Sequence, residues 1–443
     1  MTADIVDPLS RNESMSPDDE PQGLPQGTIA KPQSVALPMQ WQSRLKELNE
    51  RQRACALNIE SQLHQVWALG RNIILSWAVE PGGIMVLALP HYQITQFITA
   101  QGLVPTLVPV YFGDRAVVGM ASGKFVSDLL TGSRRVKPEQ IVSVAMLMGV
   151  APVHVQLSHP DVLAELSVDI IDMLVKRHSM SYRTDCAVAL FDIAKFSLYT
   201  PLEQMTLLNS LAYSLNSAHA KLLGRHYHLD FARSTTGDGF YIWNRDTGAD
   251  SNKHLYHLMQ LTLADNAIAL DHSKGKNTAP KLKAAFHVGS CYEFYQYEAL
   301  HPTPYNYIVG DVTIELARLI EGAIPGQILV GDFRTKGSYR GDGGGSEAPS
   351  LTAPRFIQDL QDSLSNLRGV RLSGEEVESI RCYLTGPHLG NDSFDITRLK
   401  VTDKHGLSRT AFNAKVNIYR EAVQPIFLGL RHADLVEAGA KFA

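Results

Sequence analysis

The segment Leu190-Phe191-Asp192-Ile193-Ala194-Lys195-Phe196-Ser197 decides how the rest of this 443-residue chain is interpreted. It overlaps Ala187–Phe191, a short run that is apolar at every position. Such a run is typical of a strand buried on both faces, because the polar alternation of a half-exposed strand is missing. Asp192 therefore lies at the end of a predicted buried strand, at one edge of a sheet.

A second aspartate stands in a predicted hairpin over Phe231–Trp243. The segment Thr236-Gly237-Asp238-Gly239-Phe240 places a Gly-Asp-Gly turn between two strand-like runs. Carboxylates at a strand end and at a turn tip can converge, and they then repel each other unless a cation lies between them. Mg²⁺ or Mn²⁺ suits such all-oxygen ligands. Taken singly, each residue has a structural alternative, since Asp192 can simply end a strand and Asp238 can simply form a turn.

Around these two segments the pattern follows the order strand-helix-strand-strand-helix-strand. The predicted helices carry apolar residues on one face, and the predicted strands are apolar or alternating. This order predicts an α/β fold, an α+β sandwich with helices over one sheet. The stretches that follow the first strand are Pro201–Arg225, Phe231–Trp243, Ser251–Ala269, Lys281–Val288, Asp311–Gly322 and Gln327–Val330.

Composition divides the chain into five parts. The first is a predicted disordered acidic tail, and the second is an N-terminal helical, mixed α/β region without a recognisable motif, which begins with an amphipathic helix from about Gln40 to Ser76. A core, a flexible Gly-rich loop and a C-terminal part that completes the core follow. The boundaries are 1–37, 38–180, 184–335, 336–351 and 352–443, and closing strands are expected over Phe394–Val401 and Phe412–Tyr419.

Charge and cysteine usage exclude several classes of function. The formal net charge is −4, and the first 37 residues account for all of it, so the folded remainder has no basic field to hold a nucleic acid. The four cysteines are far apart in the sequence and form no CxxC pair. They fit neither a disulfide scaffold nor a zinc site, and with no signal peptide the chain is expected in the cytoplasm.

One uncharged stretch, residues 81–113, approaches the length of a membrane span. It contains Pro90, Pro105 and Pro109. In lipid each proline would free backbone groups that a lone helix cannot satisfy again. Short strands over Gly83–Leu89 and Val104–Tyr111 account for the pattern better, so no membrane segment is expected.

Taken in order, the aspartate segments and the later Pro325-Gly326-Gln327-Ile328-Leu329-Val330 resemble the class III adenylate/guanylate cyclase family over about residues 184–335. The resemblance implies a ferredoxin-like cyclase core. It also implies that Asp192 and Asp238, with Ile193, hold two Mn²⁺ or Mg²⁺ ions per site. Arg318 falls where the family places its transition-state arginine.

The resemblance further implies that the turn after Asp192 binds the triphosphate. Its residues are Lys195, which replaces the usual glycine, Phe196 and Ser197. Lys404 matches a late lysine that contacts the terminal phosphates, and a solvent-exposed loop lysine is the alternative for it. Family members form a head-to-tail dimer with composite sites, so the resemblance implies a homodimer in which each site takes its aspartates from one subunit and its arginine and base-selecting residues from the other.

Three positions depart from the purine-cyclase pattern. Ser234 replaces the lysine and Tyr307 the aspartate, threonine or cysteine that select the base, and Ile314 replaces the asparagine that orients the ribose. A tyrosine in the base pocket removes volume, which favours a one-ring pyrimidine, and a serine hydroxyl can donate or accept at the base edge.

This combination resembles the bacterial pyrimidine cyclases of anti-phage signalling. It predicts conversion of CTP or UTP to cyclic CMP or cyclic UMP plus pyrophosphate, with the messenger read by a separate effector protein. Two alternatives stay open. One is an adenylate or guanylate cyclase, and the other is a degenerate module that binds nucleotide or only dimerises.

Overall fold

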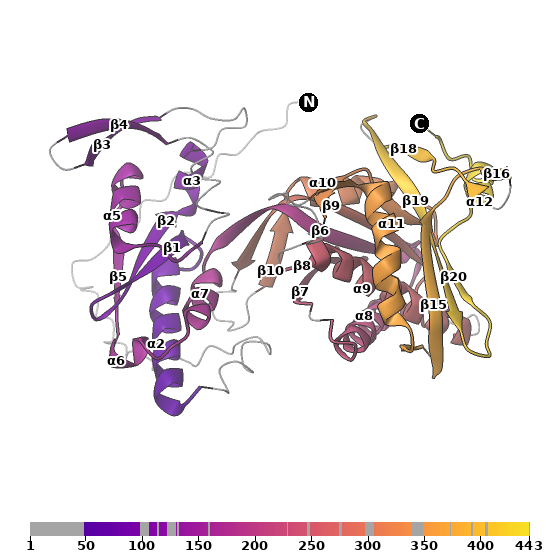
Figure 1. Cartoon of the computed structure of the whole chain (residues 1–443), viewed down its shortest axis with the longest axis horizontal. Coiled ribbons are helices and arrows are strands. Elements are labelled where there is room, and N and C mark those ends of the chain that lie inside the picture. Colours follow the sequence, from indigo (N-terminus) through magenta and orange to yellow (C-terminus); the bar gives the residue numbers. More distant parts are fainter. Residues whose placement is uncertain are drawn as a thin grey trace, which may run out of the picture. The chain divides into compact units, whose positions relative to one another are not determined.

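The computed structural model describes most of the chain after residue 47 (Figure 1). The predicted acidic tail therefore lies outside the described residues. The described segments are 48–97, 106–112, 115–121, 130, 133–157, 160–227, 229–245, 249–273, 277–296, 305–337, 349–372, 374–390, 393–403 and 406–442.

The N-terminal region has its own small sheet. Strands β1 (Asn72–Glu80), β2 (Gly83–Pro90) and β5 (Val153–Gln156) pair antiparallel in the order β1-β2-β5. Helices α2 (Glu50–Trp67), α6 (Pro160–Leu163) and α7 (Val168–Lys176) pack on one face, and α5 (Pro138–Leu147) packs on the other. The region also contains helix α3 (His91–Phe97) and the hairpin β3 (Thr106–Phe112) and β4 (Arg115–Ala121).

Of the helix expected over 40–76, the structure confirms Glu50–Trp67; residues 48–49 and 68–76 are not helical, and 40–47 lie outside the described residues. Ala68 and Leu69 adopt left-handed backbone conformations, with φ of 50° and 58°, and these end α2. The apolar residues that follow form β1 instead. Ile74 and Trp77 are buried against α2, α6 and α7, and Leu75 is buried on the face that α5 covers. In the described part of the chain no helix combines the length and the apolar character that crossing a bilayer requires.

Strand β6 (Met180–Ile193) is central to an eleven-stranded mixed sheet. The main path runs β14-β15-β19-β11-β9-β6-β8-β7, and β10, β18 and β20 pair beside it. The strands are β7 (Phe231–Thr235), β8 (Gly239–Asn244), β9 (Leu282–Gln296), β10 (Tyr305–Val309), β11 (Ile328–Gly331), β14 (Arg371–Leu372), β15 (Glu375–Leu384), β18 (Arg398–Thr402), β19 (Ser408–Arg420) and β20 (Ile426–Leu428).

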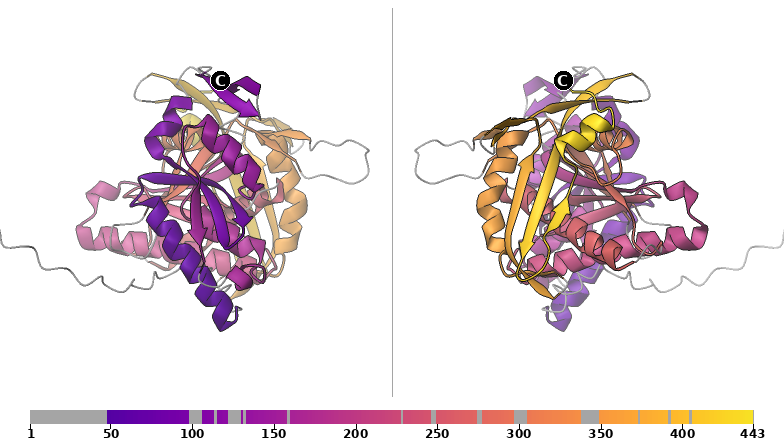
Figure 2. Two further views of the ribbon diagram at one scale, coloured as in Figure 1. Left: turned by 90° about the vertical axis from the view of Figure 1, so that its left-hand side faces the viewer. Right: turned by 90° about the vertical axis from the view of Figure 1, so that its right-hand side faces the viewer.

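Helices cover both faces of this sheet (Figure 2). Helices α8 (Pro201–Leu223), α9 (Ala249–His272) and α11 (Ala353–Leu364) pack on the face that buries Ala187, Ala189 and Phe191. Helices α10 (Asp311–Glu321) and α12 (His432–Glu437) pack on the face that buries Cys186, Val188 and Leu190. The order β6-α8-β7-β8-α9-β9 confirms the predicted α/β fold class.

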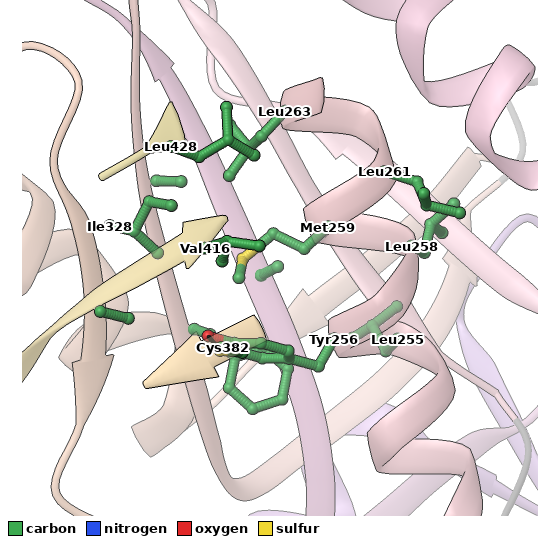
Figure 3. Packing of buried hydrophobic residues seen from close by; sticks show 14 of the residues in the cluster. Leu255, Tyr256, Leu258, Met259, Leu261, Leu263, Ile328, Cys382, Val416 and Leu428 are labelled. Atoms are coloured by element: carbon green, nitrogen blue, oxygen red, sulfur yellow. Dashed lines mark hydrogen bonds between the residues drawn. The ribbon is translucent and has the colours of Figure 1, made fainter. Parts of the chain in front are cut away.

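Segments far apart in the sequence meet in the larger core cluster (Figure 3). Tyr256 and Met259 of α9 lie against Cys382 of β15 and Val416 of β19. The Tyr256 hydroxyl is 3.5 Å from the Cys382 Sγ, so the one polar atom of this side chain has a partner. The described residues after 350 thus complete the sheet that β6 begins. Short hairpins β12 (Arg334–Lys336) with β13 (Ser350–Thr352) and β16 (His388–Gly390) with β17 (Ser393–Phe394) lie beside it.

Candidate active site

Asp192 lies at the end of β6 on the side of the sheet that faces α10. Its neighbours Phe191 and Ile193 are buried on the opposite face, as strand alternation requires. The register places Gly239 of β8 on one side of Asp192 and Lys283 of β9 on the other. Because the Ile193 side chain points away, only its backbone carbonyl is available toward a ligand beside Asp192.

The β7–β8 turn brings Asp238 to the same place. The Ile193 N–H donates to the Asp238 backbone oxygen at 3.0 Å, and the Thr236 hydroxyl donates to Asp238 Oδ1 at 3.1 Å. Gly237 has φ +99°, which suits glycine. At Gly239 a Cβ would lie 1.9 Å from the Phe191 oxygen, so only glycine allows this close approach. The sequence predicts the turn, and its contact with β6 is a finding of the structure.

Lys283 is a member of the site that the sequence analysis missed. Its Nζ lies 3.2 Å from Asp192 Oδ2, and the two side chains are 20% and 17% exposed. Burial raises the pKa of Asp192, Lys283 opposes that rise, and the nearby Asp238 carboxylate adds to it, so the pKa stays above its usual value. The alternation of Leu282, Ala284 and Phe286 indicated the face of Lys283, but only the β6–β9 register pairs it with Asp192.

The donor set at this edge fits a divalent cation. Two carboxylates face one lysine, so the cluster keeps a net negative charge, and carboxylate oxygens are the ligands that Mg²⁺ and Mn²⁺ prefer. In the described segments, no group of three His, Cys, Asp or Glu residues forms a metal cage. Asp192, Asp238 and the Ile193 carbonyl would hold such an ion only together with outside oxygens, for example those of a phosphate.

The turn after Asp192 is tightly held. Lys195 is exposed and has φ of 59°, a left-handed conformation that glycine adopts more easily. The 3₁₀ turn η1 (Phe196–Leu198) follows. The Gln204 side chain donates to the backbone oxygens of Phe196 at 3.2 Å and Tyr199 at 3.0 Å. Phe196 and Ser197 are the first residues of this turn. Their backbone N–H groups therefore have no hydrogen-bond acceptor within the turn itself.

Arg318 is held at another part of the sheet. Its Nε lies 3.6 Å from Asp403 Oδ2 and its Nη1 lies 3.6 Å from Glu321 Oε2. The Asp403 side chain is 1% exposed and also pairs with Arg409 at 3.0 Å. Lys404, which follows Asp403, lies outside the described residues. The flanking strands β18 and β19 form a hairpin, since Thr402 pairs with Ser408.

Within one chain the carboxylate that pairs with Arg318 comes from a different part of the sheet than Asp192. Asp403, which holds Arg318, belongs to the β18–β19 hairpin, and β9 and β11 lie between β19 and β6 in the sheet. At about 4.8 Å for each strand step, β6 and β19 are roughly 14 Å apart. The structure thus brings together the two predicted metal aspartates, and it places the ion-pair partner of Arg318 on a hairpin three strand steps from them.

The predicted base-selecting positions lie on two strands that contact each other. Ser234 of β7 is half-buried opposite Tyr241 of β8, and Tyr307 of β10 is 39% exposed. Strands β7 and β10 are in contact, and Ala232 and Ile308 share one buried cluster. Ile314, the predicted ribose position, is exposed on the first turns of α10.

No protein-family model matches the sequence, and no curated protein matches it. Solved structures that resemble the chain include the adenylyl cyclase CyaB from P. aeruginosa, with a TM-score of 0.32 and 13% identity over 56% of this chain and 100% of that one. They also include the guanylyl cyclase Cya2, with a TM-score of 0.30 and 9% identity over 53% and 92%. A third is an adenylate cyclase from Trypanosoma brucei, with a TM-score of 0.27 and 12% identity over 56% and 94%.

Proposed function

We propose that this chain is a nucleotide cyclase that works as a homodimer and converts a pyrimidine nucleoside triphosphate to its 3′,5′-cyclic monophosphate. The observation that carries the proposal is the pair of adjacent carboxylates, Asp192 and Asp238, with Lys283 beside them. Two carboxylates against one lysine leave a site that attracts cations and, through them, phosphate oxygens. Asp192 lies at the end of the central strand β6, and the backbone hydrogen bond between Ile193 and Asp238 holds the β7–β8 turn beside it.

The reaction would be intramolecular, between the ribose and the α-phosphate of one nucleotide. The 3′-oxygen of the ribose forms a bond to the α-phosphorus, the bond from the α-phosphorus to the bridging oxygen breaks, and pyrophosphate leaves with that oxygen. The hydroxyl proton passes to solvent. When bound, Mn²⁺ or Mg²⁺ lowers the pKa of the hydroxyl and offsets charge on the phosphates.

The residues of the chain would then have separate roles. Asp192 and Asp238 hold the two ions with their carboxylate oxygens, and the Ile193 carbonyl is a further oxygen donor there. The backbone N–H groups of Phe196 and Ser197 suit the triphosphate, and Lys195 adds charge near it. Lys404, which follows the Asp403 that pairs with Arg318, would act together with that arginine. With Asp192 engaged by an ion, the Lys283 ammonium would be available to donate a hydrogen bond to a phosphate oxygen.

A second copy of the chain would complete the site. In its own chain Arg318 pairs with Asp403 of the β18–β19 hairpin, and the resemblance assigns this arginine to the site of a second copy. Exposed apolar side chains flank both halves: Leu198 and Leu202 beside the aspartates, 78% and 71% exposed, and Val309 and Ile314 near Arg318, 47% and 52% exposed. A two-fold dimer that joins these surfaces would bring one copy's Arg318 to the other copy's Asp192.

The base preference rests on Tyr307 and Ser234. A tyrosine ring leaves less room than an aspartate, threonine or cysteine would, which disfavours a two-ring purine. The Ser234 hydroxyl can donate or accept, so it fits either cytosine or uracil. By resemblance to the pyrimidine cyclases of anti-phage signalling, we extend the proposal to a cytoplasmic second messenger that a separate effector protein reads.

A turnover assay tests the proposal. The purified protein is incubated with Mn²⁺ and, separately, ATP, GTP, CTP or UTP, and the products are identified by mass spectrometry. We expect cyclic CMP or cyclic UMP, and no product from Asp192→Ala. A cyclic purine product would keep the cyclase and exclude the pyrimidine preference. No product from any substrate would favour a non-catalytic nucleotide-binding or dimerisation module.

The dimeric site has its own test. Asp192→Ala and Arg318→Ala are each expected to be inactive, and equal mixing lets the chains exchange. A mixed dimer has one site with all its native residues, so random exchange should restore about a quarter of the activity of the unmodified protein. A mixture that stays inactive, although the chains have exchanged, would contradict a site shared between two copies.

A further inference from the structure

Tyr307 does not stand alone on its strand. Phe294 of β9 is its register partner on the neighbouring strand, and the two rings stack with centroids 5.5 Å apart and an interplanar angle of 17°. We infer that Phe294 is a positioning residue that fixes the Tyr307 ring and thereby sets the size of base that the site accepts. This inference rests on the proposed function and deepens it, because it assigns base selectivity to a residue outside the base-contacting positions.

The backbone on both sides of Phe294 is anchored. Glu293 is 2% exposed, and its Oε1 accepts a hydrogen bond from Arg245 Nε at 3.0 Å. The Arg245 guanidinium also lies 5.5 Å from the ring centroid of Tyr295, which is buried. Strand alternation turns Phe294 to the face opposite these two neighbours. Moving Phe294 away from Tyr307 would therefore disturb a buried ion pair, which is costly.

Phe294 is also supported from its other side. In the sheet it lies between Met180 of β6 and Tyr307 of β10, since it is in register with both. Its ring is half-buried, whereas Tyr307 keeps 39% of its surface exposed. The inner ring is thus held by the sheet, and the outer ring is held by the inner one while keeping a free surface for a ligand. Offset stacking of this kind favours one ring orientation.

This arrangement has a consequence for selectivity. A tyrosine that stacks on a second ring keeps its side chain in one rotamer. Its ring therefore occupies the same part of the base pocket at all times. Without that partner, rotation about χ1 lets the ring swing aside and opens space for the second ring of a purine. Loss of the stack should therefore admit purines, with a change of about tenfold in selectivity, the lower end of the range for small volume changes in a pocket.

The experiment compares three variants with the unmodified protein. Phe294→Leu removes the aromatic ring and keeps an apolar side chain, and Phe294→Tyr keeps the ring. Tyr182→Leu is the matched control, because Tyr182 forms another aromatic pair between β6 and β9, with Tyr292 at 4.7 Å. For each protein kcat and KM are measured with CTP, UTP, ATP and GTP in Mn²⁺, and thermal melting confirms folding.

We expect Phe294→Leu to lower the pyrimidine-to-purine ratio of kcat/KM about tenfold, mainly through a lower KM for purines, while kcat with the preferred pyrimidine changes little. Phe294→Tyr should restore the original ratio, and Tyr182→Leu should leave it unchanged. An unchanged ratio in folded Phe294→Leu, or an equal change in Tyr182→Leu, overturns the inference.

A binding measurement separates this result from the fate of the proposed function. Calorimetry with 3′-deoxynucleoside triphosphates, which lack the attacking hydroxyl, reports base preference without turnover. If the unmodified protein binds these analogues but turns over no substrate, the proposed cyclase is wrong, and a shifted pyrimidine-to-purine Kd ratio in Phe294→Leu still supports the role of Phe294. An unshifted ratio, or no binding of any analogue, overturns the role as well.

Discussion

Two charge clusters in this molecule look similar in composition and differ in balance. In the N-terminal region Glu60 Oε1 lies 2.8 Å from Arg177 Nη1 and 3.4 Å from His178 Nε2, and all three side chains are at most 2% exposed. In the sheet, Asp192 lies beside a second carboxylate, Asp238, and pairs with one lysine, Lys283. The first cluster has at least one positive group for its carboxylate, and the second has one positive group for two carboxylates.

The pKa shifts follow this difference. Burial alone would raise the pKa of Glu60, but the hydrogen bond and charge of His178 and the charge of Arg177 hold that pKa below its usual value. Burial and Asp238 together raise the pKa of Asp192 despite Lys283. A balanced, buried cluster stabilises a fold, whereas an unbalanced, accessible one stores negative charge for a ligand to neutralise.

The largest expected effect removes a carboxylate from the unbalanced cluster. Asp192→Ala and Asp238→Ala each remove an ion ligand, and metal stabilisation of the transition state amounts to several kcal/mol, so kcat should fall about 10³-fold or more. Neither variant should unfold, because the buried neighbours of Asp192 are unchanged. Product formation and thermal melting check both statements, and retained activity in either variant would show that the cluster does not act on the substrate.

Removal of the carboxylate from the balanced cluster should affect stability, not activity. Glu60→Ala leaves Arg177 buried without its carboxylate and should lower the free energy of unfolding by about 3–5 kcal/mol. Replacing both members, Glu60→Leu with Arg177→Met, should recover much of that loss, since an apolar pair of similar volume carries no desolvation penalty. Urea unfolding of the single and double variants measures this, and turnover per folded molecule should stay unchanged. If Glu60→Ala unfolds at the same urea concentration as the unmodified protein, the balanced cluster does not stabilise the fold.

A smaller effect is expected at the lysine of the unbalanced cluster. Lys283→Met should raise the KM for the triphosphate about tenfold or more, because a charge-assisted hydrogen bond contributes about 1.5–3 kcal/mol. Lys283→Arg, which keeps the charge, should recover most of the affinity. Steady-state kinetics separate KM from kcat, and an unchanged KM in Lys283→Met would limit Lys283 to holding Asp192 in place.

The smallest effect is a dependence of stability on pH. Because the folded-state pKa of Asp192 is raised, the metal-free folded state binds its proton more tightly than the unfolded chain does. That contribution is present at low pH and is lost as pH rises through the folded pKa. The thermal midpoint without metal should therefore fall more steeply over about pH 4 to 7 in the unmodified protein than in Asp192→Asn. Saturating Mn²⁺, which binds the ionised form, should reverse the difference.

Local patterns predicted much of the fold and half of the candidate site. The continuous apolar run at Ala187–Phe191 and the Gly-Asp-Gly turn are short-range signals, and each has the expected structure. Lys195 stands where the resembling family has a glycine. Its backbone is left-handed, the conformation that glycine adopts easily, although the residue is a lysine. These features depend on contacts between residues close in the sequence, or on steric preferences of single residue types. Both can be predicted from the sequence alone.

Other features depend on pairings that no single segment contains. Lys283 joins Asp192 only through the register of β6 with β9, and Asp403 holds Arg318 only because a distant hairpin reaches α10. The helix expected to run to residue 76 ends at Trp67 because Ala68 and Leu69 adopt conformations that their residue types rarely favour. In each case the tertiary structure decides between local alternatives.

The place of β19 in the sheet also bears on the order in which the protein is made. Residues 408–420 form the strand between β11 and β15, although they follow every other strand of the main path in the sequence. While they are still missing, the growing polypeptide exposes the unpaired edge of β11, a template for faulty association with other chains. The nascent protein also lacks Asp403 and Arg409, the residues around Arg318. Synthesis of residues 403–420 therefore completes both the pairing of the sheet and the surroundings of its arginine.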